Sequence, residues 1–263
     1  MIKREFKLNL KSFLIWLFIL VAMFLATYLI YPFMITDDAM KSFDEMMKIF
    51  PEEMLKAFNM DMNSISTAYG WFKTEGFMYV LLIIGFYSSI LGGTILLKEE
   101  SDMTIEYLNS LPITRSKIMT NKILVGMIYI VAMVLLLLLF NYVALTISCD
   151  FDQKQFFLLS LTPLLIGLPF FALNLLISTF FHNTKKSIAI SLGLVFVFYI
   201  LNTLSELSDK VEYLKYFSLY TLADVRNVMA DVAIHPINVL LSLGLTIFFF
   251  VLSYIRYQKK ELV

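Results

Sequence analysis

The chain has 263 residues, of which 59% are hydrophobic and only 16% are charged. A soluble domain of this size is about half apolar and about a quarter charged, so the composition predicts an integral membrane protein built of helices. The formal net charge is zero, which favours no charged partner until the charges are assigned to the two sides of the membrane. The single cysteine, Cys149, excludes an internal disulfide and a cysteine metal cluster.

Residues 1–12 place apolar side chains at near-helical spacing, with four basic residues largely between them. This pattern fits a short amphipathic helix that lies in the membrane interface. It fits a positively charged flank of the first membrane span equally well. We keep both interpretations open at this point.

Six long apolar runs follow, and a helix needs about 20 residues to cross a bilayer. We expect a single transmembrane domain over residues 1–263 with spans at about 13–35, 76–97, 123–147, 156–181, 188–204 and 237–255. The first run has no clear cleavage site of a secretory signal, so we expect it to remain as a span. The fourth run contains Pro163 and Pro169, which each remove a backbone donor and tend to kink a helix.

The distribution of basic residues predicts the orientation of the chain. If the N-terminus is inside, the cytoplasmic segments hold 13 of the 21 basic and 6 of the 21 acidic residues, a net charge of +7. The outer segments then carry a net charge of −7. We therefore expect both termini in the cytoplasm, together with residues 98–122.

Two longer segments, 36–75 and 205–235, fall on the expected outer side. Met40, Phe43, Met47 and Phe50 recur at a helical period in the first segment, and Leu207, Val211 and Leu214 do so in the second. We expect both segments to form amphipathic structure against the outer leaflet. Seven of the 15 methionines lie between Met34 and Met62, which tilts the expected substrate towards amphipathic molecules because methionine surfaces adapt to varied apolar ligands.

The expected spans carry no acidic, basic or histidine side chain near their middle. Charges at that depth usually mark ion paths or proton relays, so a proton-coupled carrier, a voltage sensor and an intramembrane metalloprotease are all disfavoured. The polar residues Asn141, Asn174 and Asn202 are expected to form hydrogen bonds between helices. Gly92 and Gly93 are expected to allow close helix packing.

The most distinctive stretch is the polar connector between the second and third spans, residues 98–122, which carries eight charged side chains. Acidic residues begin it, where the positive end of a helix dipole favours them, and an apolar stripe at Thr104, Ile105, Leu108 and Leu111 follows. Pro112 then disfavours helical geometry at the residue before it, and Thr114 or Ser116 can cap a new helix that begins near Arg115. The simplest alternative is an ordinary solvated loop, but such a loop needs neither the apolar stripe nor the proline.

The run from Lys98 to Lys117, KEESDMTIEYLNSLPITRSK, resembles the cytoplasmic loop after the second span of ABC-2 type permeases. These proteins are membrane subunits of ATP-binding-cassette transporters, mostly exporters. The six-span layout and the long outer segments are also similar to that family. In the family the corresponding short helix is a coupling helix that sits in a groove of a separate ATPase subunit. The resemblance implies that this contact is lined or oriented by Glu99, Glu100, Thr104, Glu106, Leu108, Pro112 and Arg115.

We therefore expect an exporter permease in a bacterial-type cell membrane that pairs with a second permease chain and with ATP-binding-cassette ATPase subunits. The chain contains no glycine-rich P-loop motif, so we expect no cofactor and no catalysis in this chain, with ATP and magnesium bound by the partner. The alternative is a non-transporting accessory, sensing or immunity protein for an antimicrobial peptide. A membrane-embedded enzyme fits least, because no credible catalytic constellation is present. We expect no nucleic-acid partner.

Overall fold

The structure is a computed structural model, which describes residues 2–34, 36, 41, 42, 45, 48, 49, 67–105, 112–207, 209–223 and 225–260. These residues form helices and no strand. Within these ranges, six helices are long and apolar enough to cross a membrane. The all-α, six-span architecture expected from the sequence is therefore confirmed.

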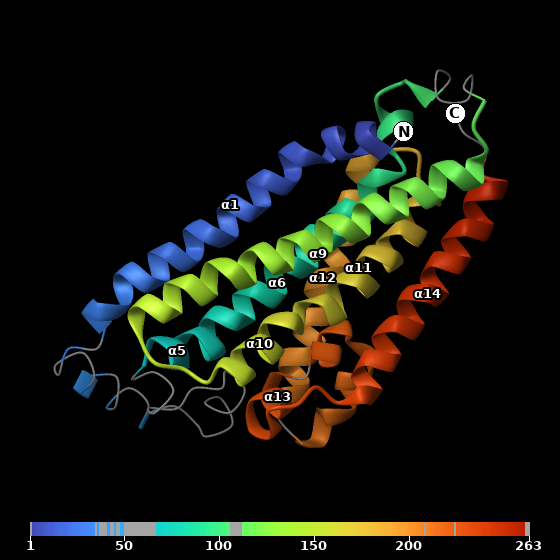
Figure 1. Cartoon of the computed structure of the whole chain (residues 1–263). Coiled ribbons are helices and arrows are strands. Elements are labelled where there is room, and N and C mark those ends of the chain that lie inside the picture. The colour runs from blue at the N-terminus through green and yellow to red at the C-terminus, as the bar shows by residue number, and fades with distance from the viewer. Residues whose placement is uncertain are drawn as a thin grey trace.

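The spans lie side by side in an elongated bundle (Figure 1). Five are formed by α1 (Ile2–Met34), α6 (Phe77–Ile95), α9 (Arg115–Ser148), α12 (Thr184–Leu207) and α14 (Pro236–Lys259). The fourth span has two parts, α10 (Gln153–Leu161) and α11 (Pro163–Ser178). The helix is interrupted before Pro163, as expected, whereas Pro169 lies inside a continuous α11.

Residues 2–12 form the first turns of α1 and continue into the span without a break. Of the two interpretations left open by the sequence, the structure favours the charged flank and not a separate interfacial helix. The reason is that this segment packs against the rest of the protein. Glu5 and Asn9 are buried there, and the hydroxyl of Tyr129 on α9 donates to the carbonyl oxygen of Phe6 at 2.5 Å.

The centre of the bundle is the contact between α6 and α11, and its closeness depends on a glycine. A Cβ atom added at Gly92 would lie 2.3 Å from the carbonyl oxygen of Phe171 and 3.0 Å from the backbone nitrogen of Leu175. Both are main-chain atoms of α11, so only glycine allows this approach. The amide of Asn174 on α11 donates to Ser89 on α6 at 2.9 Å, which is one of the interhelical hydrogen bonds expected from the sequence.

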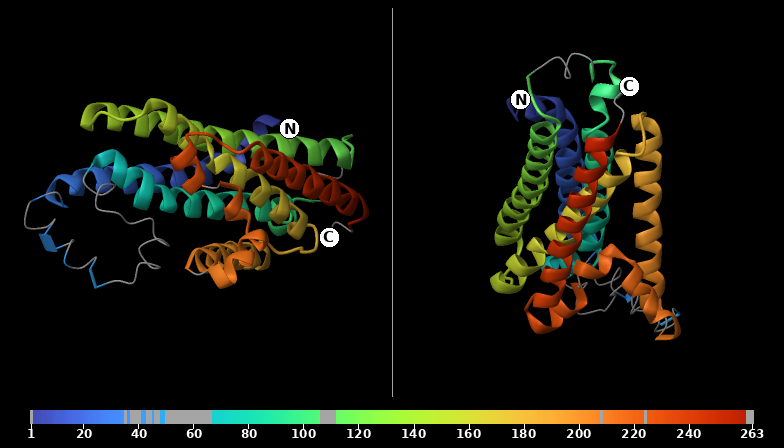
Figure 2. Two further views of the ribbon diagram at one scale, coloured as in Figure 1. Left: turned by 90° about the horizontal axis from the view of Figure 1, so that it is seen from below. Right: turned by 90° about the vertical axis from the view of Figure 1, so that its right-hand side faces the viewer.

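One end of the bundle, which we call the charged end, contains the start of α1, the starts of α9 and α12, the end of α14 and the short helix α7 (Lys98–Ser101) (Figure 1). The opposite end contains α5 (Ala68–Trp71), a π-helical turn η1 (Phe72–Gly76), the start of α10, two 3₁₀ segments η2 (Asp209–Phe217) and η3 (Leu219–Ala223), and α13 (Val225–Asp231). Figure 2 shows the same separation from two other sides. The segments that carry the net positive charge in the sequence therefore lie together at the charged end.

The outer segment 205–235 folds back onto the bundle. Leu219, Tyr220 and Leu222 in η3 are buried, and the Tyr220 ring packs against Phe170 of α11 at 5.3 Å between centroids. The hydroxyl of Thr221 reaches the side-chain oxygen of Asn202 on α12 at 3.3 Å. Most of the other expected amphipathic segment, including Met40, Phe43, Met47 and Phe50, lies outside the described residues.

Candidate functional site at the charged end

The connector begins with one helical turn, α7, so the helix that the sequence predicted from Glu99 onward is interrupted after Ser101, and Ile105 is helical again. Helix α7 ends at Ser101, and Met103 adopts a left-handed backbone conformation with φ of 55°, which stops a right-handed helix. Residues 106–111, including Glu106, Leu108 and Leu111, lie outside the described residues. The predicted cap is confirmed, because the Thr114 hydroxyl accepts from the backbone N–H of Lys117 at 3.3 Å at the start of α9.

The first carboxylate of α7, Glu99, joins α7 to α9 and α1. The Lys122 ammonium lies 2.8 Å and 3.0 Å from the two oxygens of Glu99. It also lies 3.2 Å from an oxygen of Glu5 and donates to the carbonyl oxygen of Ile95 at 2.6 Å. Glu5, Glu99 and Lys122 are all nearly inaccessible to solvent, so one cation holds two carboxylates from different helices.

The second carboxylate, Glu100, points to the other half of the bundle. One of its oxygens accepts from the ammonium of Lys260, directly after α14, at 2.7 Å. The other lies 2.8 Å from Nδ1 of His182, in the turn between α11 and α12. Lys260 also donates to the carbonyl oxygen of Phe181 at 2.6 Å. Burial lowers the pKa of Lys260, and the neighbouring Glu100 carboxylate opposes this shift.

We call Glu99 and Glu100, with their cations Lys122 and Lys260, the acidic clamp. Buried charges of this kind are stable only when they are paired, and removing one partner is costly. Two adjacent residues therefore fasten one short helix to α1 and α9 on one side and to the α11–α12 turn and α14 on the other. Weaker contacts add to it: Lys98 donates to the carbonyl oxygen of Leu8 at 2.5 Å, and Ser101 lies 3.0 Å from Thr184 between hydroxyl oxygens.

The structure places the remaining predicted contact residues at both ends of the connector. Thr104 is exposed, and its backbone N–H donates to the carbonyl oxygen of Glu99 at 2.8 Å. Pro112 is exposed just before α9. Arg115 donates to the carbonyl oxygen of Lys260 at 2.7 Å. Thr104 and Pro112 can thus line a contact, whereas the buried Glu99 and Glu100 face inward and fit an orienting role.

Sequence reasoning missed Glu5, Lys122, His182 and Lys260 as members of one site. Their partners are far apart in the chain, by 117 residues for Glu5 and Lys122 and by 160 for Glu100 and Lys260, so local pattern could not pair them. One signal was present. Glu5 is the only acidic residue among the first twelve, where four basic residues surround it, and a lone acid there indicates a specific partner.

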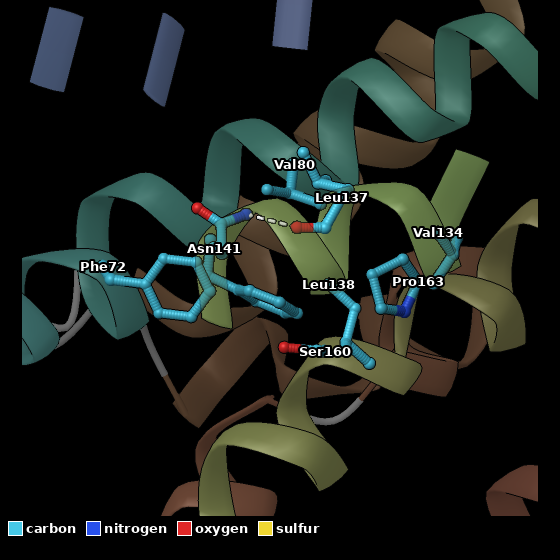
Figure 3. A pocket seen from close by; sticks show the side chains of 9 residues that line it. Phe72, Val80, Val134, Leu137, Leu138, Asn141, Ser160 and Pro163 are labelled. Atoms are coloured by element: carbon cyan, nitrogen blue, oxygen red, sulfur yellow. Dashed lines mark hydrogen bonds between the residues drawn. The ribbon is translucent and has the colours of Figure 1, made fainter. Parts of the chain in front are cut away.

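A small cavity lies in the other half of the bundle, between α6, α9 and the α10–α11 break (Figure 3). Its volume of about 10 Å³ is at the lower limit for one water molecule. Asn141 and Ser160 are the polar groups at its wall, and the Asn141 amide donates to the carbonyl oxygen of Leu137 at 3.0 Å (Figure 3). The Ser160 hydroxyl has no hydrogen-bond partner among the described atoms. This cavity is too small for an amphipathic substrate.

The fold and the charged end define an all-α, multi-pass membrane protein with a connector anchored at the end of its second span. The sequence matches the family model described as ABC-2 family transporter protein over residues 1–262, and the chain belongs to this family. Comparisons with curated proteins and with solved structures give no significant match. The family is that of permeases of ABC-type transporters, membrane components that associate with ABC ATPase subunits and are typically not catalytic themselves.

Proposed function

We propose that this chain is an exporter permease whose connector, residues 98–122, docks on a separate ATPase subunit and transmits its movement to the spans. The observation that carries the proposal is the acidic clamp. Helix α7 lies at the start of the connector. Its two buried carboxylates fasten it to α1, to α9, to the turn between α11 and α12, and to the end of α14.

This arrangement suits a lever. A force applied at the exposed connector residues reaches α7 through the covalent chain and the hydrogen bond between the N–H of Thr104 and the carbonyl of Glu99. The Glu99–Lys122 contact passes it to α9 and α1, and the Glu100–Lys260 contact passes it to α14. Because buried ion pairs resist separation, these helices move with α7. The connector can therefore shift several spans together.

The remaining parts of the assembly follow from the family architecture. A second permease chain, identical or related, completes the path, and the ATPase subunits bind ATP and magnesium. The charge difference of +7 against −7 supports a cytoplasmic charged end, and we place the protein in a bacterial-type cell membrane. The apolar, methionine-rich outer segment favours an amphipathic or hydrophobic substrate.

The test compares two substitutions in the connector, Glu106→Lys and Leu108→Asp, with the wild-type complex in membrane vesicles. The measurements are the amount of ATPase that co-purifies and the ATP-dependent export of an amphipathic fluorescent probe. We expect membrane insertion to be unchanged and both measurements to fall. Lys186→Glu is the matched control, since Lys186 is exposed at the start of α12, at the same end of the bundle but outside the connector.

Normal ATPase recovery and normal export in both connector variants would overturn the coupling role of residues 98–122. An equal loss in the Lys186→Glu control would point to a general effect of charge at this end. If no ATPase co-purifies with the wild-type chain and no vesicle export is found, the accessory or sensing alternative gains support.

A further inference from the structure

A stripe of three lysines runs along the outer face of α1 at the charged end. Lys3, Lys7 and Lys11 are spaced by four residues, which places them on one side of a helix, and all three are exposed. The opposite side of the same turns carries the buried Glu5 and Asn9. The start of α1 thus presents its acid to the protein and its lysines to the surroundings.

Several basic residues nearby have a protein partner, whereas these three lysines have none in the part of the chain that the structure describes. Arg4, Lys98, Arg115, Lys122 and Lys260 each contact a carboxylate or a carbonyl oxygen. For Lys3, Lys7 and Lys11 no ion pair or hydrogen bond occurs with any part of the chain that the structure describes. Their charge is therefore available to a ligand.

The lysine stripe continues into a shallow, open apolar hollow on one face of α1. This face is formed by Lys7, Leu10, Lys11, Leu14, Ile15 and Phe18, all on this one helix. The Leu14 side chain is 51% exposed and that of Phe18 is 72% exposed. From Lys11 to Phe18 the helix rises about 10 Å, which is enough for Lys7 and Lys11 to reach lipid head groups while Leu14, Ile15 and Phe18 contact acyl chains. Figure 1 shows α1 at the edge of the bundle, with α9 beside it.

We propose that this face of α1 binds one anionic phospholipid, with its phosphate at Lys7 and Lys11 and an acyl chain along Leu14, Ile15 and Phe18. Clusters of basic residues next to a membrane span attract anionic head groups, and the hollow adds a place for the chain. A second copy of this protein is the other occupant of an apolar membrane face. A symmetric contact of this face with itself would bring like-charged lysine stripes together, and such contacts are unfavourable.

The position of the site also connects it with the clamp. Lys7 lies half a helical turn from Glu5, which shares Lys122 with Glu99. A lipid held on the outer face of α1 therefore stabilises the position of the helix that supplies Glu5. We expect the anionic lipid to raise the thermal stability of the protein more than a zwitterionic lipid does.

The test uses the full-length protein in nanodiscs of phosphatidylcholine, with and without phosphatidylglycerol. Native mass spectrometry measures the phosphatidylglycerol retained by each chain after release from the disc. The variants are Lys7→Gln with Lys11→Gln, the charge-preserving pair Lys7→Arg with Lys11→Arg, and the control pair Lys185→Gln with Lys186→Gln. The control pair is exposed at the same end of the bundle but on α12.

Each lysine near an anionic surface strengthens the attraction about fivefold, so the Lys7 and Lys11 glutamine pair should lower the apparent affinity by about 25-fold. The arginine pair and the control pair should retain the lipid. An unchanged affinity in the glutamine pair, or an equal loss in the control pair, would overturn the site. So would efficient disulfide formation between two copies that carry Leu14→Cys in a Cys149→Ser background, because a second copy would then cover the face.

Discussion

The ammonium of Lys122, in the second turn of α9, lies 2.8 Å from a carboxylate oxygen of Glu99 in α7, and both side chains are almost completely buried. The same ammonium lies 3.2 Å from an oxygen of Glu5. The second oxygen of Glu5 has no hydrogen-bond partner among the described atoms. The lysine therefore balances more negative charge than a simple pair would, and the stability of the charged end depends on it.

The first prediction concerns this lysine. Lys122→Met removes the closest cation from the buried carboxylates of Glu5 and Glu99 and leaves Glu99 only the more distant Arg4 at 3.9 Å, and we expect the free energy of unfolding to fall by about 3–5 kcal/mol. Thermal or denaturant unfolding in detergent measures the loss. Lys117→Met is the control, since Lys117 is exposed on the same helix, and its effect should stay within about 0.5 kcal/mol. Equal effects of the two substitutions would contradict the buried pair.

A second prediction uses the pH dependence of stability at Lys260. Burial lowers the pKa of this lysine in the folded protein, whereas in the unfolded chain it titrates at about 10.4. Between these two values the unfolded chain binds more protons than the folded one, so the unfolding free energy rises with pH. Arginine does not titrate in this range. Wild type should therefore gain stability relative to Lys260→Arg as the pH rises from about 7 towards about 10. Parallel stability curves would show that the pKa of Lys260 is not lowered in the folded protein.

The third prediction tests the close contact of α6 and α11. Gly92→Ala places a Cβ atom 2.3 Å from the carbonyl oxygen of Phe171, and we expect a loss of about 1–3 kcal/mol as the helices separate. Gly193→Ala is the matched control, because no atom lies within 4 Å of the added Cβ in α12. That substitution should raise stability by about 0.5–1 kcal/mol, since alanine favours the helix. A neutral Gly92→Ala would mean that the two helices lie farther apart.

The fourth prediction concerns the orientation in the membrane. In a Cys149→Ser background, a cysteine at Leu55 should react with a membrane-impermeant maleimide from outside intact cells. A cysteine at Glu106 should react only after the membrane is permeabilised. The opposite labelling pattern would reverse the topology and would place the connector on the outer side, where no ATPase subunit could reach it.

The sequence predicted the spans because hydropathy is a local property, and it predicted the cap at Thr114 because capping depends on neighbouring residues. The helix expected to run on from Glu99 is interrupted after Ser101, because the apolar stripe does not reveal the left-handed conformation at Met103. Ile105, the described apolar member of the stripe, is buried, and Leu108 and Leu111 lie outside the described residues. Met103 itself is 91% exposed, and the turn is closed by the local hydrogen bond from the N–H of Thr104 to the carbonyl oxygen of Glu99.

The clamp could not be predicted for a related reason. Charges near the ends of membrane spans normally face water or head groups. From the sequence alone, Glu5, Lys122 and Lys260 are therefore expected to be exposed to solvent. Only the folded bundle brings them together. By contrast, the resemblance carried by the connector pointed to the ABC-2 family, which the family match confirms.

The attachment of α7 to residues on both sides of it in the chain has a consequence for biosynthesis. Glu99 can pair once α9 has entered the membrane, because Glu5 and Lys122 are then in place. The pair of Glu100 and Lys260 must wait longer, because Lys260 follows α14, the last span in the chain. The connector therefore acquires its final anchorage only after every span has been inserted. A partner subunit that recognises the fully anchored connector would distinguish finished permeases from incomplete ones.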